Sequence, residues 1–257
     1  MDGQAVLAAF DTQVRRNATG PDGRAERDAR VTRFVFDDGS WAGVLWSDLD
    51  ESNADEVIAE QVRRFADRTT PWEWKYFSYD HPSDLPERLV AAGFTPEPDE
   101  SVLVAEIEDL DLDASPPPGV ELRPVTDEAG AAAMDVVHEA AFEEGSSDIG
   151  RHVLTGSVHD PPSVVGVVAW AGDTPVSAAR LELYHGTDFA GLFGGGTHPD
   201  WRGRGIFRAL VAYRARVAAQ HGFRYLQVDA MPTSRPILQR LGFVELATTT
   251  PFIHSGG

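Results

Sequence analysis

The two halves of this 257-residue chain repeat one another, and this repeat constrains the fold more than any other feature of the sequence. Gly93–Phe94 and Gly242–Phe243 lie 149 positions apart, and at the same spacing "WKYFSYD" (residues 74–80) matches "FRYLQVD" (residues 223–229). Self-similarity at a fixed spacing indicates two copies of one supersecondary unit. Two unrelated α/β cores would also share part of this pattern.

The match continues upstream of these segments. At the spacing of 149, Ile206 of an apolar helical stripe falls on Val57, and "WAGVL" (residues 41–45) matches "FAGLF" (residues 189–193) at a spacing of 148. Each half is therefore expected to contain a strand, a helix and a second strand in the same order.

The second half gives the clearer succession of elements. A helix is predicted over 126–142, with Thr126 as its N-cap and acidic residues in its first turn. A hairpin is predicted around "AGDTP", because β-branched runs flank a Gly-Asp turn. The other predictions are strands over 119–125, 188–197, 223–230 and 248–254, and helices over 205–220 and 234–241. This alternation predicts an α/β protein built on a mixed (α+β) sheet.

A connector separates the halves. "DLDLDASPPPG" (residues 109–119) combines acidic residues with three prolines and a glycine, a composition typical of extended links between folded units. We predict an N-terminal domain over 1–112, a linker over 113–118 and a C-terminal domain over 119–257.

The composition excludes several kinds of chemistry. The chain has no cysteine, so disulfides, thiolate metal sites and cysteine nucleophiles are ruled out. Its histidines show no metal-ligand spacing, so no metal site is predicted. The net charge of −19 disfavours nucleic acid as a partner, because phosphate backbones would be repelled.

The charge is unevenly distributed. Residues 1–115 hold 11 basic and 26 acidic residues, a net charge of −15, whereas the stretch from Trp201 to Gly242 holds eight arginines and one acid, Asp229. No membrane-spanning run and no signal peptide are recognisable, so a soluble cytoplasmic protein without a membrane partner is expected.

The cationic stretch begins with "HPDWRGRGIFRAL" (residues 198–210), where a strand gives way to a helix. Free N–H groups and the positive end of the helix dipole meet there, and Gly203 and Gly205 allow close backbone approach, so a phosphate or pyrophosphate ligand is expected. A Walker loop would need a lysine after its last glycine, and the single lysine is Lys75. A dinucleotide fingerprint would need glycine at Arg208.

The stretch resembles the acetyl-CoA signature [QR]-x-x-G-x-[GA] of the GNAT superfamily of N-acetyltransferases, with Arg202 first, Gly205 as its glycine and Phe207 where a small residue is usual. The order of elements from Gly119 and the closing "LQRLGF" are similar too. The resemblance implies two GNAT-like units, each a central mixed sheet flanked by helices. It also implies acetyl-CoA as co-substrate, with its thioester where two central strands splay.

The residues that this resemblance assigns to the cofactor lie in one continuous region. Those that would pair with the pantetheine arm are Gly194, Gly195, Gly196 and Thr197. Those that would surround the pyrophosphate are Arg202, Gly203, Arg204, Gly205, Ile206, Phe207 and Arg208. Phe207 would have to point into the core for the ligand to approach.

The first half lacks this turn. At the spacing of 149, Arg202, Arg204 and Gly205 correspond to Asn53, Asp55 and Glu56, residues that cap a helix well and repel a pyrophosphate. The N-terminal copy is therefore expected to keep the fold and to have lost the cofactor.

Acetyl transfer needs an unprotonated amine, a donor at the thioester carbonyl and often a proton for the thiolate. Backbone N–H groups of residues 195–197 are candidates for the donor, and Glu182 and Asp229 for the base. Each acid also has a structural interpretation, as a solvent-facing strand residue or a turn residue. Many family members carry a tyrosine that acts as the general acid at the position where this chain has Leu238. Ser234 or water would replace it, unless the thiolate leaves unassisted.

The sequence thus predicts an acetyl-CoA-dependent N-acetyltransferase that acts on a primary amine of a small cationic molecule, as a monomer or homodimer. A non-catalytic acyl-CoA sensor or scaffold is the alternative that the missing tyrosine favours. A chain that binds no nucleotide is a third possibility.

Overall fold

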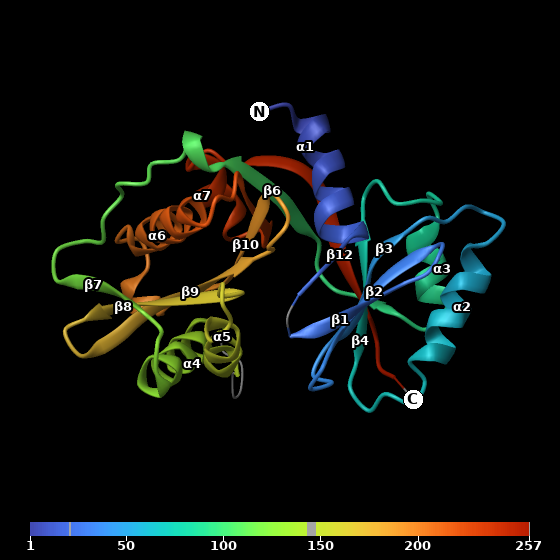
Figure 1. Cartoon of the computed structure of the whole chain (residues 1–257), viewed down its shortest axis with the longest axis horizontal. Coiled ribbons are helices and arrows are strands. Elements are labelled where there is room, and N and C mark those ends of the chain that lie inside the picture. Colours follow the sequence, from blue (N-terminus) through green and yellow to red (C-terminus); the bar gives the residue numbers. More distant parts are fainter. Residues whose placement is uncertain (21, 143–147, 257) are drawn as a thin grey trace. The chain divides into compact units, whose positions relative to one another are not determined.

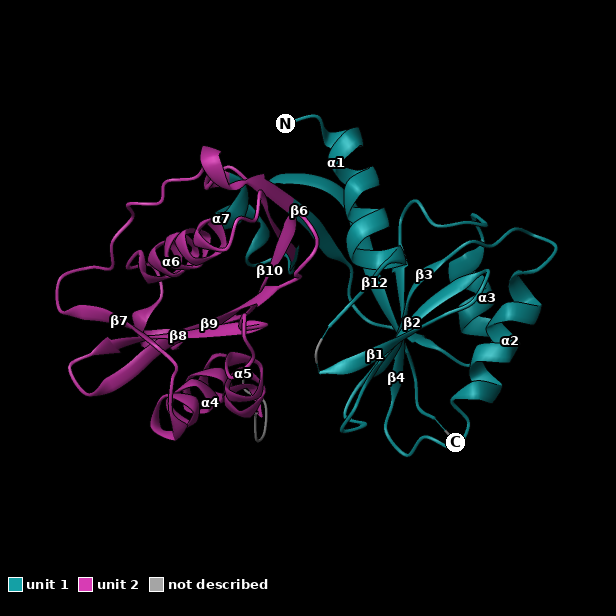
Figure 2. Ribbon diagram, in the orientation of Figure 1, with its two compact units in different colours: residues 1–103, 229–239, 244–257 teal, residues 104–228, 240–243 magenta. Residues whose placement is uncertain are grey.

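The computed structural model describes residues 1–20, 22–142 and 148–256, which form two compact units. Unit 1 contains residues 1–103, 229–239 and 244–257, and unit 2 contains residues 104–228 and 240–243 (Figure 2). Each unit is a mixed β-sheet flanked by helices, as the sequence predicts (Figure 1).

Unit 1 begins with helical segments and continues into a sheet. Its elements are α1 (Gly3–Phe10), the π-helical η1 (Asp11–Arg16), β1 (Gly23–Arg27), β2 (Val31–Phe36), β3 (Ala42–Ser47), α2 (Ala54–Arg64), β4 (Trp72–Phe77), α3 (Leu85–Ala91), β5 (Thr95–Pro96), α7 (Arg235–Arg240) and β12 (Val244–His254). Its strands lie in the order β1-β2-β3-β4-β12, with β5 beside β12. Trp72, Trp74 and Phe252 of the sheet bury their side chains against Ile58 of α2 and Leu89 of α3.

Two strands carry the chain between the units. β6 (Glu100–Glu106) runs from unit 1 into unit 2, and β11 (Tyr225–Ala230) runs back. The remaining elements of unit 2 are η2 (Ile107–Asp109), β7 (Val120–Pro124), α4 (Glu128–Phe142), α5 (Ile149–Ser157), β8 (Val164–Ala171), β9 (Thr174–Leu183), β10 (Phe189–Thr197), η3 (Pro199–Trp201) and α6 (Ile206–Gln220).

The sheet of unit 2 has a helix layer on each face, and its strands lie in the order β7-β8-β9-β10-β11. Alternate residues of one strand face opposite layers. Ala178 of β9 packs with Met134 of α4 and α5, whereas its neighbour Ala179 packs with Ile206 and Leu210 of α6.

The two units share one succession of pairings. β1-β2-β3 and β8-β9-β10 are antiparallel, and a helix then leads to a parallel strand, β4 or β11. This likeness supports two copies of one unit. The spacing of 149 between the copies, however, does not hold along their whole length. Gly43 pairs with Glu73 and Gly191 with Gln227, and those partners lie 154 positions apart.

The register corrects two expected correspondences. Asp80 lies beyond the end of β4, whereas Asp229 lies within β11, so the two aspartates are not at equivalent places. α2 begins at Ala54 and α6 at Ile206, 152 positions later, so Asp50 rather than Asn53 corresponds to Arg202. The first copy still has an acid where the second has its arginine.

The compact units cut across the predicted domains. β12, from the end of the chain, pairs with β4 over Thr249–His254, which places residues 244–257 in unit 1. The boundary at 113–118 stays a prediction about where the two sequence copies meet. Strand pairing, which brings distant segments together, decides the compact units instead.

The predicted elements of the second half are present, with two differences. The cap of α4 is Asp127, whose Oδ1 accepts the N–H of Gly130 at 2.9 Å, rather than Thr126. α5 has no counterpart among the predictions, because its two glycines and its β-branched residues give it a low intrinsic helix propensity. No helix in the described part of the chain is long and apolar enough to cross a bilayer.

Candidate active site

The turn between β10 and α6 presents an open stretch of backbone. Gly203 and Gly205 have φ values of 75° and 83°, in the left-handed region that glycine adopts without strain. A Cβ at either position would meet nothing within 4 Å. Gly205 is the N-cap of α6 and offers no side chain to the first N–H groups of the helix. The start of α6 therefore combines free donors, a positive dipole end and space.

The arginines of this turn bind the chain itself. Arg202 donates from Nε to the carbonyl oxygen of Thr197 at 3.1 Å and from Nη2 to that of Ala141 at 3.0 Å. Arg204 donates to the carbonyl oxygen of Asp200 at 2.9 Å and lies over the ring of Trp201. Both guanidinium groups hold the turn in shape while they add positive charge beside it.

β10 is bulged where its three glycines lie. Its pairing with β9 shifts between Phe193 and Gly196, and Gly194 has a φ of 56°. A Cβ on Gly194 would lie 2.3 Å from Ile149, and one on Gly196 would lie 2.8 Å from Ala141. Glycine is required here because α4 and α5 pack directly on the strand.

β10 also separates from β11. The two strands pair only over Phe189–Gly191 with Tyr225–Gln227, although β10 continues to Thr197. In the described residues, the part of β10 from Leu192 onward therefore has an edge with no ladder partner on the β11 side. The predicted splay of the two central strands is present in this sense.

The first residues of α6 divide between the core and this edge. Ile206 is buried and Arg208 is exposed, as the apolar stripe predicts. Phe207 differs from the prediction: it is only half-buried, and its ring lies 3.3 Å from where Gly195 would carry a Cβ. Its side chain therefore borders the β10 glycines rather than filling the core.

Glu182 lies in an ion-paired cluster on β9. Arg180 Nε is 3.0 Å from its Oε1, and His152 Nε2 of α5 is 3.7 Å from the same atom. Burial alone would raise the pKa of Glu182, but Arg180 and His152 outweigh burial and lower it. Arg180 also approaches the glycine bulge, since its Nη1 lies 3.2 Å from the Cβ position of Gly194. The carboxylate is thus ionised beside the bulge.

Asp229 and Ser234 belong to unit 1, whereas Glu182 and the turn belong to unit 2. Asp229 Oδ2 lies 2.8 Å from Nζ of Lys75. Ser234 donates from Oγ to the carbonyl oxygen of Met231 at 3.2 Å. Leu238, at the place of the usual tyrosine, is buried with 1% of its surface exposed.

Sequence reasoning missed Arg214. It lies on α6 among the apolar residues that face the sheet, and its guanidinium is buried beside Gly195. The signal was visible, because an arginine four residues after Leu210 continues a stripe of otherwise apolar side chains.

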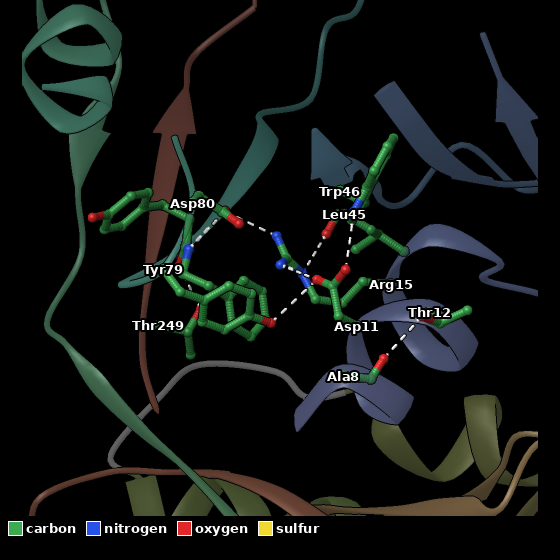
Figure 3. Close-up of polar contacts among 11 residues, drawn as sticks. Ala8, Asp11, Thr12, Arg15, Leu45, Trp46, Tyr79, Asp80 and Thr249 are labelled. Carbon is green, nitrogen blue, oxygen red and sulfur yellow. Dashed lines mark hydrogen bonds and ion pairs between the residues drawn. The ribbon is translucent and has the colours of Figure 1, made fainter. Parts of the chain in front are cut away.

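In unit 1 the corresponding place, where β3 and β4 separate, is filled by Arg15 (Figure 3). β3 and β4 pair at Gly43–Glu73 and Val44–Trp74, and the next carbonyl oxygen of β3, that of Leu45, accepts Arg15 Nε at 3.0 Å. Arg15 also pairs with Asp11 at 2.6 Å and with Asp80 at 2.9 Å. The buried guanidinium joins the ends of the two strands.

Comparisons with known proteins give a family match for the second half of the chain and a fold match for the whole chain. The sequence pattern described as the acetyltransferase (GNAT) family matches residues 131–243. No curated protein sequence matches the chain.

In the described residues, no group of three or more His, Cys, Asp or Glu could hold a metal ion.

The fold is that of solved acetyltransferases. A GCN5-related N-acetyltransferase from Kribbella flavida superposes with a TM-score of 0.71 at 18% identity, covering 100% of this chain and 96% of its own. One from Sphaerobacter thermophilus gives 0.61 at 14% identity, covering 98% and 90%. A tandem GNAT protein from the clavulanic acid biosynthesis pathway gives 0.59 at 13% identity, covering 100% and 96%.

Proposed function

Residues 131–243 of this chain belong to the acetyltransferase (GNAT) family, whose members are N-acetyltransferases that use acetyl-CoA, and from this premise we propose that the chain acetylates the primary amine of a small cationic molecule. The observation that carries the proposal is the continuity of two open backbone features, the splayed edge of β10 and the glycine turn that begins α6.

The residues present fit acetyl-CoA. The edge of β10 around Gly194–Thr197 offers main-chain N–H groups to a pantetheine arm, although the carbonyl oxygens of Gly196 and Thr197 already accept Ser177 and Arg202, and the N–H groups after Gly205 suit a pyrophosphate. Arg202 and Arg204 hold this turn and add positive charge to it. When bound, acetyl-CoA supplies an acetyl group activated as a thioester.

Glu182 is the group that we propose for the acceptor. Because its pKa is lowered, its carboxylate is ionised at neutral pH and attracts an ammonium group. Arg180, whose Nε lies 3.0 Å from its Oε1, fixes its position, so it can also orient the amine as the nitrogen loses its proton. The net charge of −19 favours the approach of a cation.

The proposal is tested by incubating the full chain with acetyl-CoA and a panel of primary amines while free thiol is measured. Thiol release that requires a cationic amine supports it. Uniform failure of cationic amines, with release on neutral or acidic ones, contradicts the acceptor class.

A matched pair of variants tests the cofactor site. Gly205 and Gly222 lie at opposite ends of α6, with φ values of 83° and 82° and nothing within 4 Å of a Cβ at either. Gly205→Ala and Gly222→Ala should therefore lose similar stability, about 1 kcal/mol. Gly205→Ala alone should weaken CoA binding, by about tenfold, because its methyl group occupies the open turn. Equal CoA affinities in the two variants would contradict the site.

A second candidate function, a non-catalytic acyl-CoA sensor, follows from Leu238. This leucine is buried and carries no proton to donate. A sensor predicts that acetyl-CoA raises the Tm of the chain while no amine in the panel releases thiol.

A further inference from the structure

Arg214 places a buried positive charge beneath the glycine bulge of β10. Only 2% of its surface is exposed. It donates from Nε to the carbonyl oxygen of Leu210 and from Nη1 to that of Arg180, each at 3.1 Å. Its Nη2 lies 4.0 Å from the Cβ position of Gly195, on the side of the strand that faces α6. Among the described residues, Nη2 has no acceptor and the guanidinium has no carboxylate partner.

The chain treats its other buried arginines differently. Arg15 pairs with Asp11 and Asp80, and Arg33 pairs with Asp28 at 2.9 Å. Such pairing is expected, because a buried ion without a counter-charge costs several kcal/mol. Arg214 is the exception in the described structure, so its charge is left to pair with an anion that the described residues do not supply.

Arg214 carries its charge at neutral pH. Burial, together with the neighbouring charge of Arg180, lowers the pKa of Arg214 to about 9. The same burial removes water, which strengthens its interaction with any anion that reaches Gly195.

The position along α6 indicates which part of a ligand this anion belongs to. Arg214 lies eight residues after Ile206, about 12 Å along the helix backbone from the end that suits a pyrophosphate, and its guanidinium reaches back only as far as the carbonyl oxygen of Leu210. Its Nη2 faces β10 where that strand has already left β11. This place suits the sulfur end of acetyl-CoA rather than its phosphates.

We propose that Arg214 stabilises the negative charge that forms on the coenzyme A sulfur during acetyl transfer. The inference rests on the proposed function and adds a residue to it. Leu238 cannot donate a proton to the leaving thiolate. A fixed cation near the sulfur would stabilise the thiolate without a proton transfer.

The step balances without a protein acid. The amine nitrogen forms a bond to the thioester carbon, the carbon–sulfur bond breaks, and its electron pair stays on sulfur as a thiolate. The nitrogen loses its proton to water. Arg214 keeps its own proton throughout and lowers the free energy of the thiolate.

The test compares CoA with desulfo-CoA, which lacks the sulfur, by titration calorimetry from pH 6 to pH 8, below the pKa of about 9 of Arg214. Wild-type chain should bind CoA increasingly more tightly than desulfo-CoA as pH rises, because a nearby arginine lowers the thiol pKa by about one unit. That shift corresponds to at most about tenfold in relative affinity, reached only where the free thiol is itself ionised. Arg214→Met should abolish the pH dependence and lower kcat about 100-fold.

Arg216→Met is the matched control, since Arg216 lies on the same helix and also donates to a main-chain carbonyl oxygen, that of Leu112. It should behave as wild type. Arg214→Lys keeps a cation and should retain part of the pH dependence. If Arg214→Met does not fold, the pH dependence of Arg214→Lys tests the role of Arg214 instead. A wild-type chain that binds CoA and desulfo-CoA alike at every pH overturns the role of Arg214 and leaves the proposed function standing. A wild-type chain that binds neither overturns both.

Discussion

Lys75 and Asp229 form an ion pair, with 2.8 Å between Nζ and Oδ2. Glu100 lies 3.4 Å from the same nitrogen. Burial alone would lower the pKa of Lys75, but Asp229, Glu73 and Glu100 outweigh burial and raise it. Asp229 is thus engaged with the single lysine of the chain, which favours the structural interpretation of this aspartate over a catalytic one.

Asp229→Asn should destabilise the chain by about 2 kcal/mol in urea unfolding, because it weakens a largely buried ion pair. Thiol release per folded molecule should change less than threefold. Glu100→Gln is the comparison: burial raises the pKa of Glu100, so its neutral replacement should cost less stability. Should Asp229→Asn keep full stability and lose acetyl transfer, Asp229 would be catalytic instead.

The sequence predicts most of what is local in this fold. The hairpin of β8 and β9, the glycine-rich β10 and the start of α6 at Gly205 follow from β-branched runs, a Gly-Asp turn and a helical stripe. Each of these depends on residues close together in the chain. The same local patterns place the cofactor candidates around one turn.

What depends on distant contacts was not predictable from one sequence. The pairing of β12 with β4 joins residues 172 to 182 positions apart, from Thr249 with Phe77 to His254 with Trp72, and no local pattern specifies it. Arg202 was expected to face a ligand, yet its nearest acceptors are carbonyl oxygens of Thr197 and Ala141. A guanidinium is drawn to any carbonyl within reach, and tertiary packing decides which one that is.

Arg15→Met should destabilise the chain strongly and leave CoA binding unchanged. The variant leaves Asp11 and Asp80 without their buried cation, a change that costs about 3–5 kcal/mol. Arg16→Met is the control, because Arg16 is exposed and lies over the ring of Trp46. Urea unfolding and CoA titration below the transition give both readouts. Weaker CoA binding by folded Arg15→Met would show that unit 1 takes part in cofactor binding.

Glu182→Gln should lower kcat/KM for a cationic amine about 100-fold, because an uncharged amide does not attract an ammonium group. Glu121→Gln is the matched control, a strand glutamate paired with Arg123 on an exposed surface, and it should behave as wild type.

The pH profile separates this role from a structural one. The pKa of Glu182 is lowered from its ordinary value of 4.5, so the carboxylate is ionised above that pH and gains a proton only as pH falls below it. The advantage of wild type over Glu182→Gln should therefore be constant from about pH 6 up to the pH at which the amine itself loses its charge, and on the acid side it should disappear only below the ordinary glutamate range. The same linkage makes Glu182 stabilise the fold above pH 4.5 and lose that contribution as pH falls. An advantage that vanishes near pH 7 would assign the acceptor-binding role to a different group.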